Sequence, residues 1–285
     1  MALLLSACSS GDPTADAAGA AGGPDAIPTA DAVKLLPPGT SELTLAVSVS
    51  GNPPGNVYLP DGKTLTGQDI DFAHAVGNAL GISLRTEQAA FEAILPALDG
   101  GKFDIGASNF GVTGERRRTV GFVTYINDGQ GFAAREDSEL SEVTDLKQLC
   151  GRKVATGAGT TFEAALEESR HLCTDAGDDA CTVQTYSEPG ALWSSLQQGR
   201  SDIVMFTISG LRYAVAHQQG LKFLNEFHRL DVGFALKKGS KLAPAVQTAV
   251  NGLIADGTYA RILKKWDTTE SAIEKSSISP QELTG

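Results

Sequence analysis

The chain has 285 residues, of which 41% are apolar and 20% are charged, so it can bury a substantial core and we expect it to divide into two lobes. Its formal net charge of −11 argues against binding of nucleic acid, because nucleic-acid-binding proteins concentrate positive charge. No apolar run approaches the roughly 18 residues that cross a bilayer, so the sequence predicts no membrane-spanning helix.

The first ten residues, MALLLSACSS, contain a short leucine run followed by Ser6-Ala7-Cys8. This pattern resembles a lipobox, the site at which bacterial lipoproteins are cleaved and lipidated on a cysteine. A secretory signal also needs a basic segment and about 7 to 15 apolar residues, which are missing here, so we expect the natural start to lie upstream. We therefore interpret residues 1–8 as a signal remnant with Cys8 as the lipidation site. A cysteine present by accident is the alternative.

Residues 9–40 are rich in Ala, Gly, Pro and Asp and show no hydrophobic period of 2 or 3.6. A segment of this composition cannot bury a core, so we expect it to be disordered. About thirty flexible residues reach roughly 30 Å on average. The segment is therefore predicted to be a tether that keeps a folded domain near a membrane partner.

The first folded elements alternate between strands and helices. Alternating apolar residues from Leu43 to Val49 predict a strand, which a turn containing Asn52 ends. The helix that follows has one apolar face, and we interpret Asp69 and Asp71 at its start as helix caps. A strand at 82–84 precedes a second helix with an apolar face made of Phe91, Ile94, Leu95 and Leu98.

The stretch Asp104 to Arg118, DIGASNFGVTGERRR, reads as a short buried strand, a polar loop and a basic helix start. Ligands of open α/β sheets bind at the carboxyl ends of such strands. Ser108 and Asn109 supply short hydrogen-bonding side chains, and Gly111 would let a ligand approach the main chain. The guanidinium of Arg116 can hold a carboxylate in two parallel hydrogen bonds, so this loop predicts an anion site.

A solvated basic helix face made of Arg116, Arg117 and Arg118 is the alternative interpretation. The strand, the polar loop and the motif Thr113-Gly114-Glu115-Arg116 resemble, however, the carboxylate-binding loop of the bacterial solute-binding proteins of family 3. These are the polar amino acid receptors of ABC importers. The resemblance extends from about Glu42 to Asp267.

The resemblance implies a ligand cleft to which three segments of lobe 1 contribute. The turn at Asn52 would form one wall, the ring of Phe91 would pack on the ligand's side chain, and the loop around Ser108 and Arg116 would bind its carboxylate. A plain turn is the alternative for Asn52, and a core position is the alternative for Phe91.

The second lobe is predicted to begin after a crossing segment at 126–133. A strand near Lys153 leads into a glycine-rich turn, in which Thr160 and Glu163 form a capping box. The turn lacks the Lys-Ser/Thr ending of a phosphate loop, which argues against a nucleotide site. The resemblance implies instead that Thr160 and Thr161 present hydroxyls and helix N–H groups to the ligand carboxylate.

The segment Gly199-Arg200-Ser201-Asp202 opens a strand that ends at Thr207. In the family this strand ends in an Asp that receives the α-ammonium of the ligand. A hydroxyl brings no charge, and charge-assisted hydrogen bonds contribute roughly 1.5 to 3 kcal/mol against about 1 kcal/mol for neutral ones. We therefore expect a ligand without a free α-amine, or compensation by another acid such as Glu188.

Three cysteines remain besides Cys8. The lipobox implies an oxidising exterior, in which a disulfide persists. The resemblance implies a Cys150–Cys173 bridge, because family members with Cys-Gly before the second-lobe strand often carry a partner near the end of the next helix. A Cys150–Cys181 bridge is the alternative. Spacings of 22 and 7 residues match no zinc finger, so neither a metal nor another cofactor is expected.

The pattern as a whole predicts an α/β protein with the two-lobed fold of type II periplasmic binding proteins, each lobe a mostly parallel sheet flanked by helices. Lobe 1 is expected at 41–130 and 231–267, and lobe 2 at 131–230. A second crossing segment is expected at 231–236. Residues 268–285 are polar and are expected to form a loose tail.

The resemblance implies a monomeric, lipid-anchored receptor outside the cell membrane. It would capture an amino acid or a related small carboxylate by hinge closure and deliver it to an ABC permease. The sequence has no Gly-x-Ser-x-Gly elbow, so we expect no enzyme. An enzyme resembling cyclohexadienyl dehydratases, which share the fold, is one alternative, and a solute-sensing surface protein is another.

Overall fold

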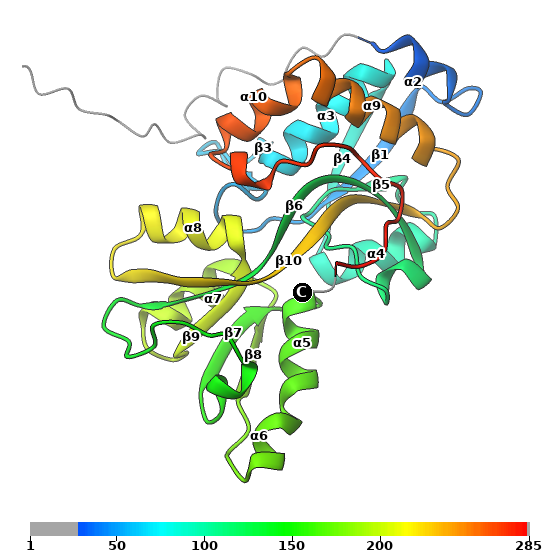
Figure 1. The fold of residues 1–285 in the computed structure, drawn as a ribbon. Coiled ribbons are helices and arrows are strands. Elements are labelled where there is room, and N and C mark those ends of the chain that lie inside the picture. Colours follow the sequence, from blue (N-terminus) through cyan, green and yellow to red (C-terminus); the bar gives the residue numbers. More distant parts are fainter. Residues whose placement is uncertain (1–27, 284–285) are drawn as a thin grey trace, which may run out of the picture.

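The computed structural model describes residues 28–283. They form two lobes that share one eight-stranded sheet with the strand order β4-β1-β5-β10-β6-β9-β7-β8 (Figure 1). This arrangement confirms the predicted two-lobed α/β class. The predicted lipidation site Cys8 and most of the predicted tether lie outside the described residues.

Two long strands connect the lobes. β6 (Val120–Arg135) and β10 (Leu221–Lys237) pair antiparallel from Lys237↔Val120 in lobe 1 to Leu221↔Arg135 in lobe 2. The first expected crossing segment, 126–133, covers the middle of β6. The second, 231–236, is placed too late, because Ala235 and Leu236 already pair with β5 of lobe 1. The register of the crossing ribbon made by β6 and β10 shifts between Phe223 and Asn225, between Glu226 and His228, and between Val232 and Gly233.

Lobe 1 contains the parallel strands β1 (Glu42–Val47), β4 (Ser83–Gln88) and β5 (Ile105–Gly106). Helices α3 (Gln68–Leu80), α9 (Ala243–Ala255) and α10 (Thr258–Lys265) pack on one face, and α4 (Phe91–Asp99) packs on the other. Alternation explains both layers, because Leu45 and Val47 of β1 contact the first layer and Ala46 contacts the second. The short pair β2 (Val57–Tyr58) and β3 (Leu65–Thr66) lies apart from the main sheet.

Lobe 2 contains the parallel strands β7 (Lys153–Gly157), β8 (Thr182–Tyr186) and β9 (Ile203–Thr207). Helices α5 (Thr161–Ser169), α6 (His171–Ala176), α7 (Pro189–Gln197) and α8 (Ile208–His217) surround them. Before β7 lies the 3-10 helix η2 (Leu146–Leu149), which Asp145 caps. The structure joins Cys150 to Cys173 in the disulfide that the resemblance implied, and Cys181 is free and buried.

The predicted tether is ordered at its end, which corrects its expected boundary at residue 40. Residues Ala30–Lys34 form helix α2, Ala32 is fully buried, and the N–H of Thr29 donates to the carbonyl of Ala79 (2.9 Å). One buried small side chain and a backbone hydrogen bond therefore hold this segment against α3 and α9.

The C-terminal segment is also packed, and the expectation of a loose tail is wrong for residues 268–283. After η3 (Thr269–Ser271) the segment runs along β6, where Ser276 Oγ donates to the carbonyl of Thr124 (2.6 Å) and Ile278 forms a bridge with Val123. β9 pairs with β6 only from Gln130 onward, so this earlier part of β6 has an open edge that the segment covers.

No helix among residues 28–283 is both long enough and apolar enough to span a bilayer.

Candidate ligand site between the lobes

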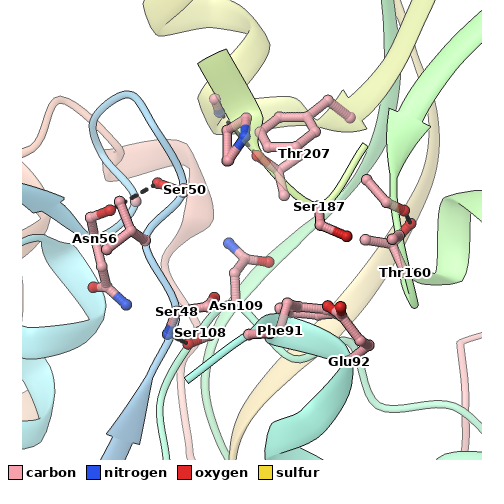
Figure 2. Close-up of a pocket in the computed structure, with 18 of the residues that line it drawn as sticks. Ser48, Ser50, Asn56, Phe91, Glu92, Ser108, Asn109, Thr160, Ser187 and Thr207 are labelled. Carbon is pink, nitrogen blue, oxygen red and sulfur yellow. Dashed lines mark hydrogen bonds between the residues drawn. The ribbon is translucent and has the colours of Figure 1, made fainter. Parts of the chain in front are cut away.

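A cavity of about 460 Å³ lies between the lobes. Its lobe 1 side comes from the segments that follow β1, β4 and β5, and its lobe 2 side comes from the starts of α5, α7 and α8. Figure 2 shows Ser108, Asn109 and Phe91 on one side facing Thr160, Ser187 and Thr207 on the other. Eight of the residues predicted from the sequence line it: Asn52, Phe91, Ser108, Asn109, Arg116, Thr160, Thr161 and Thr207.

Ser108 and Asn109 form the start of the polar loop. The Oγ of Ser108 accepts from the N–H of Ser48 (2.7 Å) and donates to the carbonyl of Ala107 (2.7 Å), which fixes β5 beside the end of β1. Asn109 has a left-handed backbone (φ +50°), a conformation that Asn tolerates better than most residues. Its amide nitrogen donates to Asp128 (2.9 Å), so its position in the cavity is fixed by a buried partner.

Arg116 opens the 3-10 helix η1 (Arg116–Arg118) and is half-buried at the cavity. Its two terminal nitrogens donate to the carbonyls of Gly111 (3.2 Å) and Gly159 (3.3 Å), the second of which belongs to lobe 2. Within residues 28–283 it forms no salt bridge. Burial lowers the pKa of this guanidinium to about 10, so it stays charged near neutral pH. It is therefore a cation at the cavity that has no carboxylate in a salt bridge with it.

Gly111 does not line the cavity, contrary to the sequence prediction. It forms a bridge with Val232 of β10, and a side chain added to it would meet Leu230 at 2.9 Å. The glycine packs closely against Leu230 of the crossing ribbon, and its carbonyl serves the site by orienting Arg116.

Phe91 fits both interpretations made from the sequence. Its ring stacks on the buried Phe110 (centroids 5.0 Å apart), lines the cavity, and lies 5.7 Å from the guanidinium carbon of Arg116. Such a ring supports the cation from one side and leaves its hydrogen-bonding edge free to bind an anion.

Asn52 connects the lobes. Its amide nitrogen donates to the carbonyl of Gly210 in α8 (3.0 Å), and its amide oxygen accepts from the indole of Trp193 in α7 (3.2 Å). The residue is buried, and the side chain of a plain turn would be solvated instead. Because both partners belong to lobe 2, these hydrogen bonds join the two lobes directly.

The lobe 2 side supplies hydroxyls and a helix start. Thr160 is the N-cap of α5 and accepts from the N–H of Glu163 (3.2 Å), as the capping box predicted. The carboxylate of Glu163 accepts from the N–H of Gly159 (2.7 Å) and not from that of Thr160. Thr160, Thr161 and the first turn of α5 therefore face the cavity beside Arg116, where the positive end of the helix dipole favours an anion.

Thr207 lines the cavity at the end of β9. Its Oγ1 accepts from the N–H of Gly210 (3.1 Å) as the N-cap of α8, so one of its two acceptor positions is occupied. Glu188, the acid considered as compensation, also lines the cavity but is exposed at the start of α7.

Asp69 and Asp128 are two acids whose place at or beside the site the sequence analysis missed, as it also missed Ser187 and Ser209. Asp69 does not cap α3, since its carboxylate accepts from the hydroxyl of Tyr125 (2.5 Å) and lines the cavity. Asp71 does not cap α3 either, because it accepts from Lys265 and Trp266. Asp128 lies in β6 and accepts from Asn109 and Ser209, and no local motif marks it.

Burial dominates the pKa of both carboxyl groups. It raises the pKa of Asp69 to about 6, although the hydrogen bond from Tyr125 acts in the opposite direction. It also raises the pKa of Asp128, against the hydrogen bonds from Ser209 and Asn109. The cavity therefore has a cationic end at Arg116 and an acidic region, where Asp69 lines it and Asp128 lies behind Asn109. Such an arrangement suits a small zwitterion.

The two lobes, the crossing ribbon and the polar cavity between them define a type II periplasmic binding protein, a class that captures small molecules by closing two lobes. The model of the bacterial extracellular solute-binding proteins, family 3, matches residues 44–269. This chain belongs to that family.

Its relatives include the arginine-binding protein ArgT of Corynebacterium glutamicum, which is 27% identical over 81% of this chain and 76% of ArgT. The L-cystine-binding protein TcyJ of Escherichia coli is 29% identical over 78% of this chain and 82% of TcyJ. Among solved structures, an ancestral arginine-binding protein bound to arginine is 28% identical and has a TM-score of 0.71, covering 79% of this chain and 98% of that protein.

Proposed function

We propose that this chain is the substrate-binding component of an ABC importer, in which an L-amino acid binds between the lobes and is delivered to a membrane permease. The observation that carries the proposal is Arg116, a charged side chain at the cavity without a carboxylate partner in residues 28–283. A planar guanidinium held by two backbone carbonyls is oriented to bind a carboxylate through its remaining N–H groups.

Closure is the functional event in this proposal. Arg116 and Asn52 of lobe 1 already donate to carbonyls of lobe 2, so a ligand carboxylate that binds Arg116 would also meet the start of α5. A ligand shifts the equilibrium only if it binds the closed form more tightly than the open one. A permease that recognises the closed form would then distinguish loaded from empty receptors.

The ligand class is an amino acid, and the relatives suggest which ones to test first. Proteins named for binding arginine and cystine are both similar to this chain, and both ligands carry a carboxylate and an ammonium group. For a ligand of about ten heavy atoms, a typical efficiency of 0.8 to 1 kcal/mol per atom corresponds to roughly micromolar affinity or better.

The proposed setting is extracytoplasmic. A monomeric receptor with a lipid on Cys8 would stay at the outer side of the cell membrane, near its permease. Radiolabelled fatty acid incorporation into the expressed chain, compared with a Cys8→Ala variant, tests the anchor. No turnover is expected, and consumption of prephenate or arogenate by the purified protein would favour the dehydratase alternative.

Calorimetric titration of residues 28–283 with the twenty standard L-amino acids and L-cystine tests the binding role. Arg116→Ala should weaken the tightest of these interactions by at least about 2 kcal/mol, roughly 30-fold, because a charge-assisted pair is lost. Arg118→Ala is the matched control in the same 3-10 helix, since Arg118 is exposed and contacts Glu115 instead of the cavity. Unchanged affinity in the Arg116 variant would contradict the carboxylate assignment.

A further inference from the structure

The residue at the end of β9 does not supply the charge that an ammonium group needs. Thr207 is neutral, and its oxygen already accepts from the start of α8. Glu188 lies at the exposed rim, where water screens its charge. A cationic group inside the cavity must therefore find its partner elsewhere.

One carboxylate, Asp69, lines the cavity, and a second, Asp128, lies behind Asn109 and Ser209, which line it. We call Asp69, Asn109 and Asp128 together the acidic floor. Asp69 is 3% exposed and Asp128 is 1% exposed. They come from α3 and β6, and neither forms a salt bridge within residues 28–283. The nearby guanidinium of Arg229 is bonded to Glu226 (2.8 Å). Two buried acids without a cationic partner are costly unless a ligand supplies the cation.

Asn109 connects the acidic floor to the cavity. Because its Nδ2 donates to Asp128 (2.9 Å), the amide has a fixed orientation and its Oδ1 remains available as an acceptor. Figure 2 shows this side chain projecting into the middle of the cavity. Ser209, which also lines the cavity, donates to Asp128 through both its N–H (3.2 Å) and its hydroxyl (2.6 Å).

We infer that the acidic floor binds the ammonium group of the ligand, in place of the residue at the end of β9. An ammonium has three N–H donors, which the amide oxygen of Asn109 and the carboxylate of Asp69 can accept, while the charge of Asp128 acts from directly behind Asn109. The inference rests on the proposed amino acid function and names how this chain distinguishes amino acids from other carboxylic acids.

The test compares two ligands with one protein. For the tightest-binding L-amino acid of the calorimetric panel, we use the α-hydroxy acid with the same side chain, which keeps the carboxylate and lacks the ammonium. The ratio of the two affinities measures amine recognition alone. Asp128→Asn keeps an acceptor for Ser209 and removes the charge, and it should lower this ratio at least tenfold.

Matched variants separate amine recognition from general damage. Asp71→Asn removes a buried carboxylate of the same helix as Asp69 that bonds to Lys265 and Trp266 away from the cavity, so the ratio should not change. Glu188→Gln tests the rival acid and should also leave the ratio unchanged. If Asp128→Asn does not fold, Asn109→Gly removes the amide oxygen at a left-handed position that suits glycine, and it should lower the ratio similarly.

The possible failures are distinct. If no L-amino acid binds the unmodified protein, the proposed function fails and this inference fails with it. If an amino acid binds but its ratio is unaffected by Asp128→Asn or Asn109→Gly, the function stands and the acidic floor is overturned. A ratio that falls only in Glu188→Gln would assign the ammonium to the rim.

Discussion

The two sides of the cavity differ in chemistry. Lobe 1 and the crossing ribbon place charges at the cavity or directly behind it, on Arg116, Asp69 and Asp128. Apart from the exposed Glu188, lobe 2 contributes hydroxyls, carbonyls and the starts of three helices. Charged groups can attract a ligand before the lobes close. Groups that reach the ligand only on closure contribute through shape complementarity and neutral hydrogen bonds. Under the proposed function, lobe 1 would select the ligand and lobe 2 would report its presence by closing.

The largest expected effect concerns the charged residues of lobe 1 and is a pH dependence of stability. The pKa of Asp69 is raised to about 6 in the folded protein, so the folded state holds this proton more tightly than the unfolded chain does. Its contribution to stability is therefore full below about pH 4 and is lost as the pH rises through about 6. Without ligand, Asp69→Asn should gain about 3 kcal/mol of unfolding free energy relative to the unmodified protein between pH 4 and pH 7.5.

Urea unfolding of both proteins at several pH values measures this difference. The titratable groups that face Asp69 are Tyr125 and Asp128, and the backbone N–H of Asn109 also donates to it. The variant keeps all three groups. A difference between the two proteins that stays constant across this pH range would show that Asp69 is not a buried, cation-free carboxyl.

A smaller effect is expected from the contacts that lobe 2 makes with lobe 1. Asn52→Ala removes two hydrogen bonds that cross between the lobes, from Asn52 to Gly210 and from Trp193 to Asn52. We expect amino acid affinity to fall by about 2 kcal/mol, because each bond contributes about 1 kcal/mol to the closed form. Trp193→Phe removes only the indole donor and should cost about half as much. Calorimetry measures the affinity of the three proteins for the amino acid. Equal affinities would show that these two hydrogen bonds do not stabilise the closed form.

The smallest effect tests closure by steric means. Gly159 has a left-handed backbone (φ +70°), and a side chain there would meet Glu92 of α4 across the cleft at 2.6 Å. Gly159→Ala should therefore weaken binding by about 1 kcal/mol. Gly177→Ala is matched, because that glycine is also left-handed (φ +82°) and a side chain added there would meet no atom within 4 Å. Both variants should lose similar stability, and only Gly159→Ala should lose affinity.

The sequence reaches those parts of the site whose residues are close together in the chain. The loop from Ser108 to Arg116 and the turn at Thr160 each combine a strand end with polar residues, a local pattern that predicts a site. Asp69, by contrast, stands in a helix start and was interpreted as a cap, and only the fold brings it near Asp128. Sites assembled across long separations leave no local pattern.

The fold follows the same rule. Strand alternation and helical periodicity predict most of the two lobes, but the tail at 268–283 is polar and its order depends on the open edge of β6. Helix α2 likewise depends on one buried alanine. Helix α9 was not assigned, although Ala245, Val246, Ala249, Val250 and Leu253 give it a buried face.

The most direct measurement is a crystal structure of residues 28–283 with the tightest-binding L-amino acid. We expect the ligand carboxylate within hydrogen-bond distance of the guanidinium of Arg116 and the start of α5, with its ammonium on Asn109 and Asp69. A ligand bound in the reverse orientation, or outside the cavity between the lobes, would contradict the account.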